Sequence, residues 1–112
     1  MLAKPNRLTR GSDYKATVRR GNRCAGAHTV TYVGRAGDPA VARFGFIVNR
    51  QVGSAVVRNT VRRRLKAVCA EVLPTIRPDV DVVIRALPSA ATADFASLRD
   101  EVTRCLQRRA AA

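Results

Sequence analysis

Apolar residues along the chain recur with the period of a strand in some segments and of a helix in others. Alternating β-branched residues predict strands over 28–33 and 42–49, which we interpret as a hairpin because Gly, Asp and Pro lie between them. An apolar run predicts a further strand over 80–87. A short additional strand would fit within 21–27 or around Gln51.

Three segments have helical features. The first covers 12–21, with Ser12 as a suitable N-cap and Gly21 at its end. The second follows Gly53 and is stopped by Pro74, and the third begins at Thr92 as its cap. Apolar stripes mark the core faces of the last two helices (Val57, Val61, Leu65, Val68 and Val72; Phe95, Leu98, Val102, Cys105 and Leu106).

The predicted order is helix, strand, strand, short strand, helix, strand, helix, which indicates a small mixed α/β (α+β) fold. Its strand–helix–strand part predicts a crossover connection. A chain of 112 residues with 46% hydrophobic residues suits one domain over 1–112. We expect 1–10 to form a loose basic arm and 108–112 to be a frayed tail.

Charge narrows the possible partners. Twenty-one Lys and Arg residues oppose eight Asp and Glu, for a net charge of +13. Self-repulsion of this size favours a polyanionic partner, and nucleic acid releases counterions when its phosphates are neutralised. An anionic membrane surface fits less well, because no segment reads as an amphipathic helix rich in Trp or Phe. No apolar run reaches the length of a membrane span.

The cysteines and the single histidine do not form a recognisable metal-binding pattern. Cys24, Cys69 and Cys105 are far apart, and His28 stands alone, so we expect no protein-bound metal. Cys69 and Cys105 lie on apolar helix faces and are predicted to be small buried hydrophobes. The pattern is typical of a reducing compartment, and we therefore expect a cytoplasmic protein.

The segment "GSAVVRNTVRRRLKAV" (53–68) concentrates cations on one side of a helix. Asn59, Arg62, Arg63 and Lys66 cluster on another sector from the apolar stripe, with Arg58 beside them and Arg64 across the stripe. Within this predicted helix no acid comes before Glu71. A solvated charged face normally interleaves acids at i±4, so we favour a helix that tracks phosphates. The Gly53-Ser54 start also exposes backbone N–H groups that suit a phosphate oxygen.

This segment resembles the basic signature of the bacterial ribonuclease P protein family, G-x-A-V-x-R-N-x-x-[KR]-R-x-x-[KR]. The matching positions are Gly53, Ala55, Val56, Arg58, Asn59, Arg62, Arg63 and Lys66. The resemblance continues from about Arg7 to Leu106. It includes "RLTRGSDYKATVRRG", "RFGFIVNRQVG" and "DVVIRALPSAATADFASL", which are similar to the segments flanking the family's signature.

The resemblance implies an endonucleolytic ribonucleoprotein in which a catalytic RNA removes the 5′ leader of precursor tRNA with Mg²⁺. The protein would be a cofactor subunit with no catalytic residue and no metal of its own. It would bind the catalytic RNA through the signature helix (Gly53, Arg58, Asn59, Arg62, Arg63 and Lys66). A cleft between the first helix and the sheet would hold the leader (Tyr14, Val18, Tyr32, Phe46 and Arg85). Catalytic RNA and precursor tRNA are the implied partners, and neither DNA nor a membrane is.

Two positions depart from the family pattern, and three of the predicted cleft residues could instead belong to the hydrophobic core or its edge. Val18 stands where the family has an aromatic residue, and Leu87 where it has an arginine before the proline; Arg85 would compensate for the latter. Tyr14 and Tyr32 would equally suit the edge of a core. Phe46 favours a core position over the cleft.

No catalytic constellation is visible in the protein itself. There is no base beside Ser or Cys, and Asp79 and Asp81 alternate without partners, which agrees with chemistry carried by RNA. The main alternative is a structural protein that binds ribosomal RNA, which would have the same size and charge. A DNA-binding regulator lacks a helix-turn-helix pair here. A nuclease acting alone lacks acid and base groups.

Overall fold

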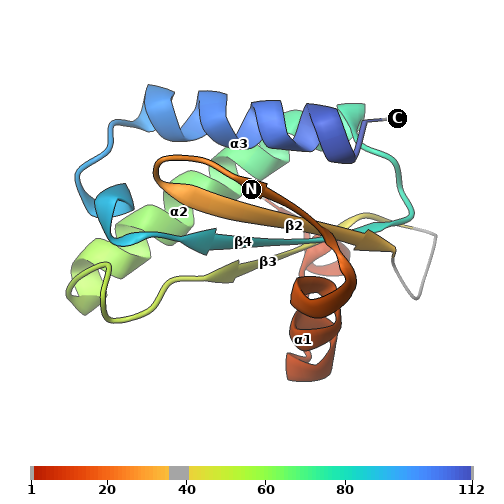
Figure 1. Ribbon diagram of the computed structural model, residues 1–112, viewed down its shortest axis with the longest axis horizontal. Helices are drawn as coiled ribbons and strands as arrows, with labels where there is room; N and C mark the ends of the chain where they lie inside the picture. The colour runs from red at the N-terminus through yellow and green to blue at the C-terminus, as the bar shows by residue number, and fades with distance from the viewer. Residues whose placement is uncertain (1, 36–40, 112) are drawn as a thin grey trace.

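The computed structural model describes residues 2–35 and 41–111 and has three α-helices and one mixed sheet (Figure 1). The strands are β1 (Asn22–Ala25), β2 (Thr29–Arg35), β3 (Arg43–Ile47) and β4 (Val80–Ala86). The helices are α1 (Gly11–Arg20), α2 (Ala55–Val72) and α3 (Phe95–Arg109). Short 3₁₀ turns cover Lys4–Asn6, Leu73–Thr75 and Pro88–Ala91.

The strand order is β1-β2-β4-β3, which corrects the predicted hairpin between β2 and β3. β4 lies between them, antiparallel to β2 and parallel to β3. The hairpin is instead formed by β1 and β2, so the short strand predicted within 21–27 exists, whereas Gln51 lies in a turn. The predicted crossover is confirmed as β3-α2-β4.

The buried character of β4 explains this order. Val80, Val82, Val83 and Ile84 are all fully buried, so both faces of the strand must be covered. The helices cover both faces of β4 at its interior position, with α1 on one side and the α2–α3 layer on the other. Alternation in β2 and β3 was compatible with a hairpin, whereas the continuous apolar run of β4 favours the interior position that it occupies.

The helices form two unequal layers around the sheet. α2 and α3 pack together over one face, whereas α1 crosses the other face near β2 and β4 (Figure 1). The predicted core stripes of α2 and α3 are confirmed. The core lies mainly under α2 and α3 and includes Phe44, Val61, Leu65, Val68, Cys69, Val82, Ile84, Leu98, Val102 and Leu106.

Two predicted N-caps, Ser12 and Thr92, each lie two residues from the observed N-cap. α1 begins at Gly11 with Arg10 as N-cap, so Ser12 lies inside the first turn. α3 is capped by Asp94 instead of Thr92, because the Asp94 carboxylate accepts a hydrogen bond of 2.8 Å from the Ser97 backbone N–H. Hydrogen bonding by Ser97 lowers the pKa of the Asp94 carboxyl below its usual value.

Both chain ends pack against the domain, which corrects the loose arm predicted over 1–10 and the frayed tail predicted over 108–112. Leu2 and Leu8 are buried, and the Leu8 N–H donates to the Phe44 carbonyl at 2.8 Å. Ala110 is fully buried, and its carbonyl accepts from the Arg77 N–H at 2.9 Å. Apolar side chains therefore anchor both terminal segments to the domain, although the charge of these segments had suggested that they would extend into solvent. Met1 and Ala112 lie outside the described residues.

The β1–β2 hairpin is fastened to α3 by a buried carboxylate. Glu101 is 6% exposed and accepts hydrogen bonds from the His28 N–H (3.2 Å to each oxygen) and from the Thr29 hydroxyl. The carboxylate occupies the space beside Gly26, where an added Cβ would lie 2.2 Å from Glu101 Cδ. The hairpin turn thus requires glycine for the approach of α3.

A disulfide between Cys24 of β1 and Cys105 of α3 joins the same two elements. Cys105 is buried as predicted, but it is bonded to Cys24 and is not simply a small hydrophobe. Cys69 is the free cysteine of the described chain and is fully buried, and burial raises the pKa of its thiol. The pairing also removes the cysteine pattern as an argument for a reducing compartment.

Candidate nucleic-acid interface

The outer side of α2 presents the cluster predicted from sequence, which we call the cationic face: Arg58, Asn59, Arg62, Arg63 and Lys66. Asn59 and Arg63 are exposed, and the other three are half-buried. The opposite side of the helix carries Val61, Leu65 and Val68 into the core. Since the core fixes the rotation of α2, the cationic face is held toward the outside of the molecule.

Contacts within the cationic face orient Arg62. Its guanidinium donates to the Asn59 side-chain oxygen at 2.9 Å and to the Val48 carbonyl at 3.4 Å. The Asn59 side-chain oxygen therefore accepts from a residue of its own helix, and the NH₂ of the same side chain remains at the exposed surface. The pair presents a fixed set of donors, which suits phosphate oxygens.

Charge on the cationic face is not neutralised within the described chain. None of the ion pairs among residues 2–35 and 41–111 involves a cation of α2. The Arg58 Nε is buried and has no acceptor among these residues. A buried donor without a partner costs about 1–3 kcal/mol, which is unfavourable in a helix that serves stability alone. Arg64 is separate and donates to the Ala93 carbonyl at 3.2 Å.

Gly53 and Ser54 set the start of this helix. Gly53 has φ +153°, in the region that favours glycine, and an added Cβ would lie 3.0 Å from a Val57 methyl. The Ser54 hydroxyl accepts from the Val57 N–H at 3.4 Å as N-cap. Gly53 thus has a structural role at the helix start. Val56, in the first turn of α2, is an apolar side chain that is 76% exposed and that no other part of the described chain covers.

The other candidate surface lies where α1 crosses the sheet. Arg43 of β3 forms a two-bond ion pair with Asp81 of β4 (2.9 and 2.8 Å) and a 3.5 Å contact with Asp13 of α1. Asp81 therefore has a partner, contrary to the prediction. This network fixes α1 against the sheet and leaves an open face beyond it.

Tyr14 is held firmly against β3. Its hydroxyl donates to the Leu8 carbonyl at 3.3 Å and accepts from the Phe46 N–H at 3.2 Å. Its ring covers Gly45, where an added Cβ would lie 2.4 Å from Tyr14 Cζ. The ring is half-buried, so Tyr14 combines the core-edge role with a partly open surface.

Tyr14 and Val18 line one side of an open hollow of about 630 Å³, together with Lys15, Arg19 and Ile47. Tyr32 lies on the same sheet face, because its neighbours in β2, Thr31 and Val33, face the α2–α3 side. Arg85 is exposed on this face as well, in register with Ile47. Four of the five predicted leader residues are thus brought to one surface, which we call the α1 cleft.

Phe46 is the exception. It pairs in register with Ile84 and packs against the core beneath α2, on the opposite face from Tyr14 and Tyr32. The period of two along β3 places Phe44 and Phe46 together, away from the α1 cleft. The prediction of Phe46 as a member of the cleft is therefore not compatible with the strand register.

Arg23 was missed in the sequence. It lies in β1 opposite Tyr32 and is exposed, so it borders the α1 cleft on the side away from α1. No local signal marked Arg23, because the sheet face of its side chain depends on the pairing of β1 with β2. Lys15 and Arg19 of α1 line the same cleft and were not selected either.

The described residues offer neither a metal cluster nor a membrane-spanning helix. No three His, Cys, Asp or Glu residues there come together as a metal site. No helix there is both long and apolar enough to cross a bilayer.

Known proteins resemble the chain over nearly its whole length. The family model described as Ribonuclease P matches residues 2–110. A "Ribonuclease P protein component" of Clavibacter michiganensis is 44% identical over 108 residues, covering 96% of each chain. That of Acidothermus cellulolyticus is 47% identical over 109 residues, covering 96% of this chain and 91% of the relative.

Solved structures share the fold at lower identity. The RNase P protein of Staphylococcus aureus gives a TM-score of 0.83 at 19% identity, with 92% of this chain and 94% of that chain covered. The RNase P protein of Thermotoga maritima gives 0.80 at 22% identity, with 91% and 96% covered. The family match and the two relatives above decide the assignment: the chain belongs to the ribonuclease P protein family, the protein components of a tRNA-processing ribonucleoprotein.

Proposed function

We propose that the protein uses two separate surfaces in ribonuclease P, the cationic face of α2 for the catalytic RNA and the α1 cleft for the leader of precursor tRNA. The observation that carries this proposal is their arrangement. α1 and α2 cover opposite faces of the sheet, so two RNA segments can bind without competing for one site (Figure 1). One surface is strongly cationic, and the other combines aromatic and cationic side chains.

The cationic face acts electrostatically in this proposal. Arginine forks bind phosphates in a bidentate manner, and each neutralised phosphate releases a counterion. Bound protein thereby reduces repulsion between RNA segments and lowers the Mg²⁺ concentration needed for cleavage. The RNA holds that Mg²⁺ and carries the chemistry, and the protein contributes binding and positioning in the bacterial cytoplasm.

The α1 cleft holds a single strand through its bases and phosphates. Stacking on an aromatic ring contributes about 1–3 kcal/mol per base and tolerates any base, which suits a subunit that serves many leaders. Tyr14 and Tyr32 provide rings, and Val18 provides an apolar contact where relatives have an aromatic residue. Arg23 and Arg85 lie where they can meet the phosphates between stacked bases.

Reconstitution tests the overall proposal. Adding the protein to a bacterial ribonuclease P RNA and precursor tRNA at low Mg²⁺ should restore cleavage that the RNA alone does not perform. Cleavage is measured by gel as release of the 5′ leader, and the same RNA at high Mg²⁺ confirms that it is competent. Absence of any stimulation by folded protein would contradict the assignment of function.

Alanine substitution of Tyr14 and Tyr32 tests the α1 cleft. The double variant should bind leader-bearing precursor about 30-fold more weakly or worse, from the loss of two stacking rings, with mature tRNA little changed. Titration of the holoenzyme with each tRNA measures the two affinities. Phe46→Leu is the matched control, because Phe46 lies on the other face and should not alter the preference for precursor. Equal losses for precursor and mature tRNA would contradict leader binding.

A further inference from the structure

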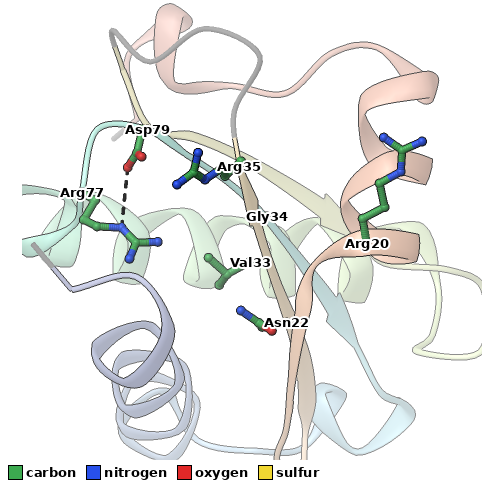
Figure 2. A pocket seen from close by; sticks show the side chains of 7 residues that line it. All are labelled: Arg20, Asn22, Val33, Gly34, Arg35, Arg77 and Asp79. Carbon is green, nitrogen blue, oxygen red and sulfur yellow. Dashed lines mark ion pairs between the residues drawn. The ribbon is translucent and has the colours of Figure 1, made fainter.

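A second group of arginines converges at the end of the sheet where β2 stops and β4 starts. A hollow of about 460 Å³ opens there, lined by Arg20, Asn22, Val33, Gly34, Arg35, Arg77 and Asp79 (Figure 2). These residues come from α1, the β1–β2 hairpin and the loop between α2 and β4. We call it the Arg35–Arg77 hollow.

Three of the polar side chains of the Arg35–Arg77 hollow are directed into a common space. Figure 2 shows the Arg77 guanidinium and the Asn22 amide extending toward Val33, and the Arg35 guanidinium extending toward Arg77 and Asp79. Arg20 lies across β2 at the end of α1, and its guanidinium points away from these three side chains. Arg35, Arg77 and Asn22 are therefore the donors that face the hollow.

Positive charge dominates this space. Asp79 is the single acid of the lining, and it contacts the Arg77 Nε at 3.5 Å, with both side chains nearly half exposed. Among the described residues, the outer nitrogens of Arg77 make one contact, at 3.5 Å with the Arg109 carbonyl. Within the same residues, Arg35 has no hydrogen-bond or ion-pair partner. Arg35 and Arg77 against one carboxylate leave room for an anion.

The Arg35–Arg77 hollow is distinct from both surfaces described above. Val33 faces the α2–α3 side of the sheet, and Arg35 lies at the end of β2, where it also lines a neighbouring hollow with Asp13 and Asp81. The residues that line the Arg35–Arg77 hollow do not line the α1 cleft beside Tyr14 and Val18. The hollow lies at the amino end of β4, and α2 starts beyond the carboxyl end of the parallel strand β3. The start of the cationic face and the hollow are thus at opposite ends of the sheet.

We propose that the Arg35–Arg77 hollow binds a phosphodiester of RNA, giving the protein a third contact with its ribonucleoprotein partners. The inference rests on the proposed function, since it assumes that RNA is the polyanion. Guanidinium pairs match the oxygens of a phosphate, and the Asn22 amide adds a neutral donor. The catalytic RNA and the precursor tRNA are two sources of this chemistry.

The first experiment uses the full-length protein alone. A short unstructured oligouridylate is added, and backbone amide shifts of Asn22 and Gly34 are followed by NMR. Binding at the Arg35–Arg77 hollow should shift both signals, and the double variant Arg35→Gln, Arg77→Gln should abolish the shifts. Asp79→Asn removes the single acid of the lining and should strengthen them. Unchanged responses in both variants would overturn the proposal.

The second experiment identifies the RNA. Each variant is titrated with ribonuclease P RNA and, as holoenzyme, with precursor tRNA over a range of salt concentrations. The double variant should bind one of them about tenfold more weakly, with the slope of log K against log salt reduced by about 1–2, as expected for one or two lost phosphate contacts. Loss with ribonuclease P RNA assigns the hollow to that RNA, and loss with precursor tRNA alone assigns it to the substrate.

The matched control is Arg104→Gln, Arg108→Gln, which removes the same charge from exposed positions of α3. Equal effects of the two double variants would contradict a specific site and leave only general attraction. Substitutions in the cationic face distinguish failure of this inference from failure of the proposed function. Loss of RNA binding on substitution in α2 with no effect at Arg35 and Arg77 refutes this inference alone, whereas no effect at either place refutes the proposed function.

Discussion

Replacement of Arg58, Arg62 and Arg63 by glutamine is expected to weaken binding of ribonuclease P RNA about 100-fold, because each charge-assisted contact contributes about 1 kcal/mol or more. The three guanidiniums have no acid partners in the described chain, and the fold loses the two hydrogen bonds that Arg62 donates to Asn59 and Val48. The larger loss is therefore expected in RNA binding. Filter binding at fixed salt measures the change, and cleavage at low Mg²⁺ should fall with it.

The control for this variant loses the same number of positive charges. Arg99, Arg104 and Arg108 of α3 are replaced together by glutamine, which also removes three positive charges from the surface. Their effect on RNA binding should be several-fold smaller, since they do not lie on the cationic face. A circular dichroism melt confirms that both triple variants are folded. Assembly at low Mg²⁺ that is unchanged in the α2 variant would refute the role of the cationic face.

Reduction of the Cys24–Cys105 disulfide is expected to lower the free energy of unfolding by about 2–4 kcal/mol. The bond closes a loop with a sequence separation of 81 residues, which restricts the unfolded chain strongly in the chain-entropy model. It also fastens β1, an edge strand with one strand neighbour, to α3. Urea unfolding with and without a thiol reductant measures the difference.

The double variant Cys24→Ser, Cys105→Ser provides the control, because its stability should not respond to the reductant. Cys69→Ala should leave the response intact, since Cys69 is buried, unpaired and protected from exchange by the raised pKa of its thiol. In a reducing cytoplasm the pair would exist as thiols, and the Glu101 contacts would then hold the hairpin to α3. Equal stability in both redox states would contradict the expected contribution.

The elements with strong local signals were predictable from sequence. α2 combines a Ser54 cap, an apolar stripe at helical spacing and Pro74 at its end, and each of these acts within a few residues. The cationic face follows from the same spacing, because the residues opposite a buried stripe must face outward. The family signature runs from Gly53, just before α2, to Lys66 within it, and this short continuous stretch explains why the resemblance was visible without a fold.

The placement of the cleft residues was predictable in part. Tyr14, Val18, Tyr32 and Arg85 meet on one sheet face, but Phe46 does not, because register in β3 depends on which strand it pairs with. Arg23 was overlooked since β1 is short and its pairing with β2 is not evident from its own residues. Assignments to a sheet face require the strand order, and local alternation does not give it.

The sequence by itself determined the helices, their core stripes, the cationic character and the family. Only the tertiary structure decided the order β1-β2-β4-β3, the disulfide and the meeting of Arg35 with Arg77. These features join residues that are distant along the chain, Cys24 with Cys105 above all. Helix formation and capping are governed by neighbours three or four residues away, whereas strand pairing and convergent charges arise from packing of the whole chain around β4.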